Sequence, residues 1–258
     1  MTELERALAF IAAMAEELAQ RKVPSRYGVA LLAPEFPSVW SRNYLYATEE
    51  LDTVSAEELA AEAERVLGEA GLRHRKVEVW DAEAGARLEP GFVQLGWNRE
   101  RDVIMVVHRE PDRPVDASAV EEVEVDDVVP AWTESWSLDP AVLSSDVARQ
   151  LVENKRRLGL ETDTRFFAGR VGGEIGSYCE LYSDGRTAQI ENVFTLDRFR
   201  KRGLARATVS KALEAAREGG HDLIFLIADY DDWPKELYGK LGFDEVGQIW
   251  EFLLPSPK

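Results

Sequence analysis

RFRKRGLARATVSKALEAAREGG is the sequence of residues 198–220, and it carries the strongest local signal in the chain. Five of its first nine residues are basic, although the 258-residue chain has a formal net charge of −17. From Leu204 onward the apolar residues recur with the period of a helix, and Gly219 and Gly220 follow as a stop signal. The segment therefore predicts a helix over residues 203–217 that begins in a cluster of positive charge.

A helix that begins among basic residues points to a bound anion. The first amides of a helix have no partner within the helix and carry partial positive charge, so acidic side chains are favoured there. Gly203 allows a ligand to approach the backbone closely, and the small Ala205 does not block it. A solvated basic helix start is the alternative, but the mismatch with the helix dipole favours an anion, and a pyrophosphate fits best.

The segments around this helix alternate between strands and helices in the manner of an α/β or α+β domain. Apolar runs bounded by turn residues predict the strands, and 3.6-residue periodicity predicts the helices. The predicted strands are 119–125, a hairpin over 164–185, 187–196, 221–229 and 246–254, and the predicted helices are 127–136, 144–159, 203–217 and 231–240.

The first half of the chain has a similar order of elements. Prolines and charges between residues 109 and 118 predict a linker, which gives an N-terminal α/β domain over 1–112 and a second domain over 118–258. Within the first domain, an amphipathic helix over 1–22 is followed by a helix, a strand, a short segment and a strand over 55–108. Gly91-Phe92 and Gly242-Phe243 occupy similar places in the two halves, which suggests an internal duplication, with chance similarity as the alternative.

The sequence Arg200-x-x-Gly203-x-Ala205 resembles the Q/R-x-x-G-x-G/A signature of the GNAT superfamily of N-acetyltransferases. Further features agree with that family in order and spacing: the hairpin at 166–178, the strand-to-helix crossing at 190–205, the apolar strand at 222–228 and the segment 231–243. The resemblance covers residues 119–254. It implies a mixed sheet flanked by helices, with the N-terminal α/β domain as a degenerate copy, and acetyl-CoA as the cosubstrate.

The resemblance also assigns roles to individual residues. Backbone groups of Val193, Phe194 and Thr195 would pair with the pantetheine arm like an added strand. Tyr238 falls on the family's tyrosine near the CoA sulfur, whereas Asp231 and Pro234 depart from the family's asparagine and alanine and put side-chain contacts to the cofactor in doubt. The residues expected to hold the pyrophosphate are Arg200, Lys201, Arg202, Gly203, Leu204, Ala205 and Arg206.

Acyl transfer to an amine needs a proton acceptor and a proton donor, because an alkylammonium must lose a proton before it attacks. We expect Tyr238 to donate a proton to the leaving thiolate. Glu191 is the first candidate for the base, with Glu180 and Asp229 as alternatives. If Phe194 faces the core, the two-residue period of a strand places Glu191 on the opposite face, where the acceptor could lie.

The sequence therefore predicts an acetyl-CoA-dependent N-acetyltransferase that acts on a primary amine of a small molecule or peptide. A non-catalytic acyl-CoA-binding or regulatory module is the alternative. The strong acidity argues against nucleic-acid and anionic-membrane partners. Three dispersed histidines and a single cysteine, Cys179, show no metal-ligand spacing, so no metal is expected. The cysteine count and the absence of a long apolar run favour a cytoplasmic protein; the acceptor and the oligomeric state stay open.

Overall fold

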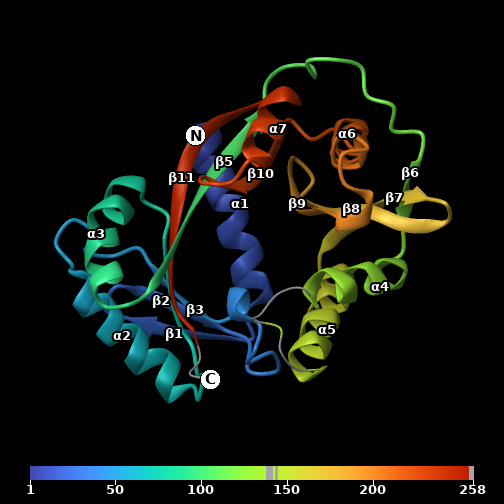
Figure 1. Cartoon of the computed structure of the whole chain (residues 1–258). Helices are drawn as coiled ribbons and strands as arrows, with labels where there is room; N and C mark the ends of the chain where they lie inside the picture. Colours follow the sequence, from blue (N-terminus) through green and yellow to red (C-terminus); the bar gives the residue numbers. More distant parts are fainter. Residues whose placement is uncertain (138–141, 143–144, 256–258) are drawn as a thin grey trace. The chain divides into compact units, whose positions relative to one another are not determined.

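The computed structural model describes residues 1–137, 142 and 145–255, so the predicted helix start at Ser144 lies outside the described residues. The chain divides into two compact units. Unit 1 comprises Met1–Ala7, Met105–Ala228 and Trp233–Val246, and unit 2 comprises Leu8–Ile104, Asp229–Asp232 and the residues from Gly247 onward. Figure 1 shows the course of the chain through both units. No helix within the described ranges is long and apolar enough to cross a membrane.

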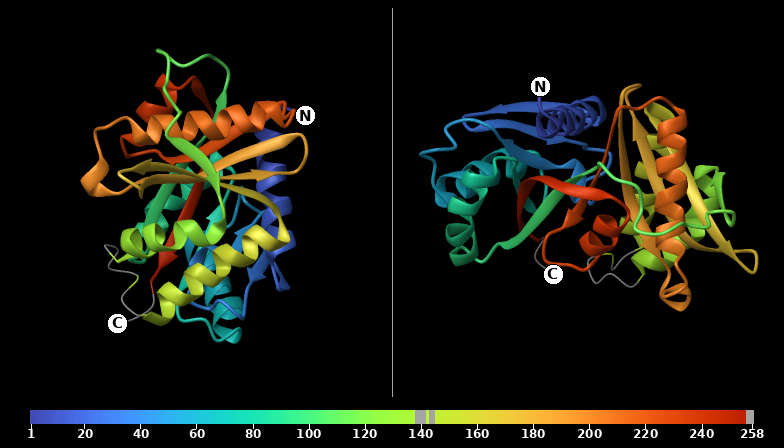
Figure 2. Two further views of the ribbon diagram at one scale, coloured as in Figure 1. Left: turned by 90° about the vertical axis from the view of Figure 1, so that its right-hand side faces the viewer. Right: turned by 90° about the horizontal axis from the view of Figure 1, so that it is seen from above.

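Unit 1 contains a mixed sheet with helices on both faces. Its strand order is β10-β9-β8-β7-β6; β9 and β10 run parallel, and the other neighbours are antiparallel. Helix α6 covers one face, and α4 and α5 cover the other (Figure 2, left). The elements are β6 (Val120–Val123), α4 (Val125–Trp136), α5 (Ser145–Glu161), β7 (Asp163–Val171), β8 (Glu174–Ser183), β9 (Thr187–Thr195), α6 (Leu204–Glu218), β10 (Leu223–Asp229) and α7 (Pro234–Lys240).

Aromatic residues hold α4 against this sheet. The side chain of Trp132 is fully buried, with the ring of Phe166 5.8 Å away and that of Tyr178 6.3 Å away, both edge-on. Edge-to-face pairs of this kind contribute about 0.5–1.5 kcal/mol each beyond the burial of their apolar area. The packing fixes α4 over the strands β7 and β8.

Unit 2 is a second α/β arrangement with the strand order β1-β2-β3-β4-β11. Strands β3 and β4 run parallel, and α2 and α3 pack against β4. Phe92 of α3 stacks on Phe252 of β11 with ring centroids 4.1 Å apart. The elements are α1 (Glu3–Leu18), which begins in unit 1, β1 (Arg21–Ser25), β2 (Gly28–Leu32), η1 (Trp40–Arg42), β3 (Tyr44–Ala47), α2 (Ala56–Glu69), β4 (Arg75–Val79), α3 (Ala82–Gln94), β5 (Asn98–Val107) and β11 (Phe243–Leu254).

The strands β5 and β11 each contribute residues to both units. Residues 250–254 of β11 pair antiparallel with β4 in unit 2. Strand β5, which follows α3 in sequence, lies next to β10 in the strand order. The division between the units therefore runs through both strands, so the units do not follow a single cut at the predicted linker.

The two halves share an order of elements, but the predicted pairing of their Gly-Phe dipeptides is wrong. In unit 1, Gly242 forms the turn before β11 at φ +99, where an added Cβ would lie 2.0 Å from the carbonyl oxygen of Arg109. Gly91 instead lies inside α3, whose 13 residues exceed the 7 of α7. Helix α3 continues through Gly91 and Phe92, whereas Gly242 lies in a turn, so the two glycines have different structural roles.

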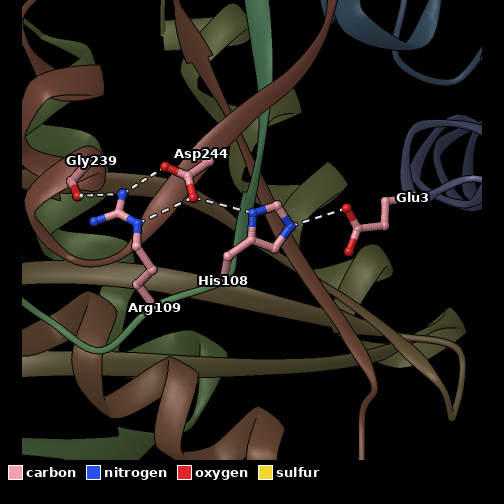
Figure 3. A network of polar contacts seen from close by, with 5 residues as sticks. All are labelled: Glu3, His108, Arg109, Gly239 and Asp244. Carbon is pink, nitrogen blue, oxygen red and sulfur yellow. Dashed lines mark hydrogen bonds and ion pairs between the residues drawn. The ribbon is translucent and has the colours of Figure 1, made fainter.

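The predicted linker is anchored to unit 1 at its start, as Figure 3 shows. His108 lies between two carboxylates, with Nε2 3.0 Å from Glu3 Oε2 and Nδ1 3.2 Å from Asp244 Oδ2. Arg109 donates to Asp244 at 2.6 Å and to the carbonyl oxygen of Gly239 at 3.5 Å. The hydrogen bond from Arg109 holds the pKa of Asp244 below its usual value. This network ties together the start of α1, residues 108–109, the end of α7 and the start of β11.

Candidate functional site

The crossing from β9 to α6 leaves a row of backbone amides free. Lys201 and Gly203 both adopt left-handed backbone conformations, with φ of 62° and 80°. Gly203 is the N-cap of α6, and an added Cβ there would meet open space. Within the described part of the chain, the amides of residues 201–206 donate no hydrogen bond, and the first in the helix to do so is that of Ala207, to Gly203. Free amides at a helix start form an anion site.

The basic side chains around these amides divide into two groups. Lys201 and Arg202 are exposed and form no ion pair with any described residue. The guanidinium of Arg202 lies 5.5 Å from the ring centroid of Phe199. Arg200 pairs with Asp197 at 2.9 Å. Two unpaired cations therefore remain to attract an anion to the free amides.

Two further basic side chains of the segment are already engaged. Arg206 is buried and donates through Nη1 to Asp112 at 2.7 Å, and the amide of Asp112 donates to the carbonyl oxygen of Lys240 at 2.8 Å. Arg198 pairs with Glu134 and Glu174. The contact of Arg206 with a pyrophosphate stays a prediction, and the structure offers its backbone amide for that contact.

Strands β9 and β10 separate beside this crossing. Their pairing begins at Leu223 with Thr187 and ends at Leu226 with Ile190, although β9 continues to Thr195. Phe194 and Thr195 pair with β8 on one side, and residues 193–195 have no partner in β10 within the described residues. The predicted pairing of Val193–Thr195 with an extended ligand therefore has a free strand edge available.

The prediction that Glu191 and Phe194 lie on opposite faces of the sheet is wrong. Glu191 pairs with Glu180 and Phe194 pairs with Tyr178, and these two partners are two residues apart on β8. Cross-strand partners point to the same face, and so do residues two apart on one strand. A bulge in β9 adds one residue between them, so both side chains lie on the face that α4 and α5 cover.

Tyr238 of α7 is brought into electrostatic reach of Glu191. Burial raises the pKa of the Tyr238 hydroxyl first, and the nearby negative charge of Glu191 raises it further. Burial likewise raises the pKa of Glu191, against the opposing effect of the Lys155 ammonium. Glu191 thus lies close enough to Tyr238 to affect the pKa of its hydroxyl.

The remaining predicted residues are engaged in contacts of their own. Asp231 is in unit 2, where its carboxylate pairs with Arg99 at 2.5 Å and Arg101 at 3.7 Å. Its contact with the cofactor stays a prediction. Asp229, an alternative base, accepts a hydrogen bond from the Asp231 amide at 2.7 Å and also belongs to unit 2. Glu180 is fully buried and bound by Lys155 at 2.7 Å.

A cavity of about 400 Å³ adjoins the crossing, and the sequence did not predict it. Trp136, Tyr178 and Phe194 give it an aromatic lining, and Arg200 lies at its edge. Its volume falls in the range of small-molecule sites. Asn192 also lines the cavity and has a φ of 53° in the middle of a strand. Asparagine tolerates this conformation better than most residues, so an asparagine inside a predicted strand was the sequence signal that was missed.

The corresponding crossing in unit 2 is closed. Strands β3 and β4 pair up to Ala47 with Val79, the last residue of each strand. Helix α2 has a complete capping box, in which Ser55 accepts from the Glu58 amide at 3.2 Å and Glu58 accepts from the Ser55 amide at 2.9 Å. Neither the strand edge nor the helix start is left open for a ligand.

Comparisons with known proteins agree with this geometry. Residues 126–243 match the model of the acetyltransferase (GNAT) family. No curated protein matches the chain in sequence. Within the described ranges there is no group of three or more histidine, cysteine or acidic side chains placed to hold a metal ion.

Among solved structures, the chain is similar to a GCN5-related N-acetyltransferase from Kribbella flavida, with a TM-score of 0.63 and 21% identity over 98% of this chain and 96% of that one. A conserved protein of unknown function from Staphylococcus epidermidis gives a TM-score of 0.70 at 14% identity, covering 92% and 94%. A tandem GNAT protein from the clavulanic acid biosynthesis pathway gives 0.52 at 14% identity, covering 78% and 70%. These likenesses show the fold, and the last is consistent with a degenerate N-terminal repeat. Residues 126–243, which include the crossing and the open strand edge, therefore match a domain of the acetyltransferase (GNAT) family.

Proposed function

We propose that the chain transfers the acetyl group of acetyl-CoA to a primary amine of a small molecule or peptide. The observation that carries the proposal is the row of free amides at residues 201–206, beside the unpaired cations Lys201 and Arg202. A pyrophosphate suits this site because it accepts several backbone hydrogen bonds and its charge complements the helix dipole. The open space beside Gly203 allows the close approach that those bonds need.

The proton transfers are assigned to Glu191 and Tyr238. The amine nitrogen attacks the thioester carbonyl carbon after its ammonium has given a proton to Glu191, directly or through water. As the carbon–sulfur bond breaks, the Tyr238 hydroxyl gives its proton to the departing sulfur, and the proton that the new amide nitrogen loses returns to the Tyr238 oxygen, directly or through water. Because the pKa of Tyr238 is raised, its hydroxyl keeps its proton throughout the neutral range until that step.

The acceptor is assigned to the cavity lined by Trp136, Tyr178 and Phe194. It lies on the same face of the sheet as Glu191, so an amine held there is on the side of the proposed base. Aromatic walls favour an acceptor with a flat or apolar body next to its amino group.

Thermal unfolding with and without acetyl-CoA tests the cofactor site. A ligand that binds the folded protein alone raises the melting temperature, and Ala205→Glu should abolish the rise by placing bulk and negative charge among the free amides. Lys211→Glu, on the same helix but away from its start, changes the charge at least as much and should keep the rise. A rise of equal size in the Ala205→Glu protein would exclude this site.

A screen of amines with detection of released CoA tests the reaction. We expect amine-dependent release of CoA for at least one class among polyamines, aminoglycosides, amino acids and peptides. Binding of acetyl-CoA without amine-dependent release in the whole screen would instead favour a non-catalytic acyl-CoA-binding module.

A further inference from the structure

The bulge in β9 is tied to a buried carboxylate on the neighbouring strand. Glu180 is fully buried, and its oxygen Oε1 accepts from Asn192 Nδ2 at 2.6 Å. Its oxygen Oε2 accepts from Lys155 Nζ at 2.7 Å and from the hydroxyl of Tyr182. Both oxygens are therefore occupied by donors, and neither is open to a substrate. This places Glu180 as an anchor and disfavours it as the base.

Asn192 holds the backbone conformation that makes the bulge. Its φ of 53° lies in the left-handed region, which most L-residues avoid and asparagine tolerates better. Tyr178 and Glu180 pair with Phe194 and Glu191, so one residue of β8 stands opposite two of β9. Asn192 is one of those two, and its side chain makes the bond to Glu180.

The bulge decides two features of the proposed site. Directly before it, at Ile190, the pairing of β9 with β10 ends. It also turns Phe194 to the face that carries Glu191. If the same residues ran as a regular strand with no bulge, Phe194 would point to the face opposite Glu191 and leave the cavity, by the two-residue period of a strand.

We propose that Asn192 is a positioning residue, fixed by the Lys155–Glu180 ion pair, that keeps β9 bulged and thereby keeps its edge open for acetyl-CoA. The proposal rests on the proposed function, because it concerns how the same site is held open. Lys155 comes from α5 and Glu180 from β8, so the bulge is held by the helix layer over the sheet as well as by its own backbone.

Three substitutions of Asn192 separate the backbone conformation from the side-chain bond. Asn192→Gly adopts the left-handed region freely and loses only the bond to Glu180. Asn192→Ala loses the bond and is disfavoured in that region. Asn192→Asp tolerates the region but brings a carboxylate against Glu180, where like charges repel.

Calorimetric titration of the full chain with acetyl-CoA measures the effect, and thermal unfolding without ligand reports the folding of each variant. We expect a dissociation constant raised up to about threefold for Asn192→Gly and about tenfold or more for Asn192→Ala and Asn192→Asp. Rescue by glycine would distinguish positioning of the backbone from a general loss of packing. Folded Ala and Asp variants that bind within twofold of the wild type, or a Gly variant weaker than the Ala variant, would overturn the proposal.

A double-mutant cycle tests the part played by Lys155, which does not contact Asn192 in any described hydrogen bond. Lys155→Met should weaken acetyl-CoA binding by about tenfold because it leaves the Glu180 charge buried without its cation. Its effect should be much smaller in the Asn192→Gly background, because the bulge is no longer tied to Glu180. Additive effects would overturn the role of the ion pair. The wild type serves as the reference: if it binds no acetyl-CoA, the proposed function fails, whereas equal binding by all variants contradicts only the role of Asn192.

Discussion

Glu180 and Glu191 stand opposite each other on β8 and β9, yet their surroundings differ. The Lys155 ammonium lies 2.7 Å from Glu180, whereas Glu191 accepts its side-chain hydrogen bond from the neutral amide of Gln189, also at 2.7 Å. Burial raises the pKa of Glu191, and Glu180 raises it further, while Lys155 lowers it. A half-buried carboxylate that binds protons more readily than usual suits a base that works near neutral pH.

Glu191→Gln should lower kcat/KM at neutral pH by about 10²- to 10⁴-fold, the range of general base catalysis. Because the pKa of Glu191 is raised, the wild-type kcat/KM should fall as pH drops through a value above the ordinary glutamate pKa, and the variant should lack that limb. A pH profile of CoA release measures both. Glu153→Gln, an exposed position on α5, is the control and should keep the wild-type profile. An unchanged limb in Glu191→Gln would assign it to another group.

Tyr238→Phe should lower kcat by about 10- to 10⁴-fold with little change in acetyl-CoA affinity. The substitution removes the hydroxyl proton but keeps the ring, which packs edge-on against Phe243 at 6.3 Å between centroids. Steady-state kinetics with calorimetric binding separates the two effects. If kcat stays within twofold of the wild type, the tyrosine is structural.

One chain should bind one acetyl-CoA. In unit 2 the strands β3 and β4 stay paired to their ends, and Ser55 and Glu58 satisfy the first amides of α2. Acidic residues at that helix start, Glu57 and Glu58, would repel a pyrophosphate. Titration calorimetry of the full chain should give a stoichiometry near one. Two sites per chain would mean that unit 2 opens to admit a ligand.

Glu62 should stabilise the protein at neutral pH but not in acid. A hydrogen bond from Arg65 is the main cause that lowers its pKa to about 2, and Ser25 adds to the effect. A lowered folded-state pKa gives stability that is present above the unfolded value and is lost as pH falls toward 2. Glu62→Gln should therefore reduce the free energy of unfolding at pH 7 by roughly 1 kcal/mol, and the difference should shrink below pH 4. Urea unfolding measures this, with exposed Glu69→Gln as the control; a difference independent of pH would refute it.

Features that depend on local sequence could be predicted. The helix over 203–217 appears as α6 (Leu204–Glu218), and the predicted hairpin appears as β7 and β8 around a turn with Gly172 and Gly173 at positive φ. The helix periodicity, the turn glycines and the Arg200–Ala205 motif each act over a few residues. The strands β1, β2 and β3 were missed because they are only 5, 5 and 4 residues long and lack clear alternation.

Features that depend on pairing between distant parts of the chain could not be predicted from the sequence. The side-chain faces of Glu191 and Phe194 follow from a bulge at Asn192, and a one-residue insertion in register leaves no periodic trace in so short a strand. The pairing of β11 with β4 was equally hidden, since each strand's own sequence is the same whichever neighbour it pairs with.

The pairing of β11 with β4 sets the order in which the protein can be completed during its synthesis. Most of unit 2 is made first, but its strand β4 waits for residues 250–254, which are synthesised about 170 residues later. Until then β4 has an unpaired edge, and Phe92 lacks the ring of Phe252 against which it stacks. The first half of the chain therefore leaves the ribosome incompletely folded, with an exposed strand edge. Nascent chains stopped after residue 245 should be cleaved by protease within residues 20–104, and full-length chains should resist; equal resistance of both would show that unit 2 folds without its borrowed strand.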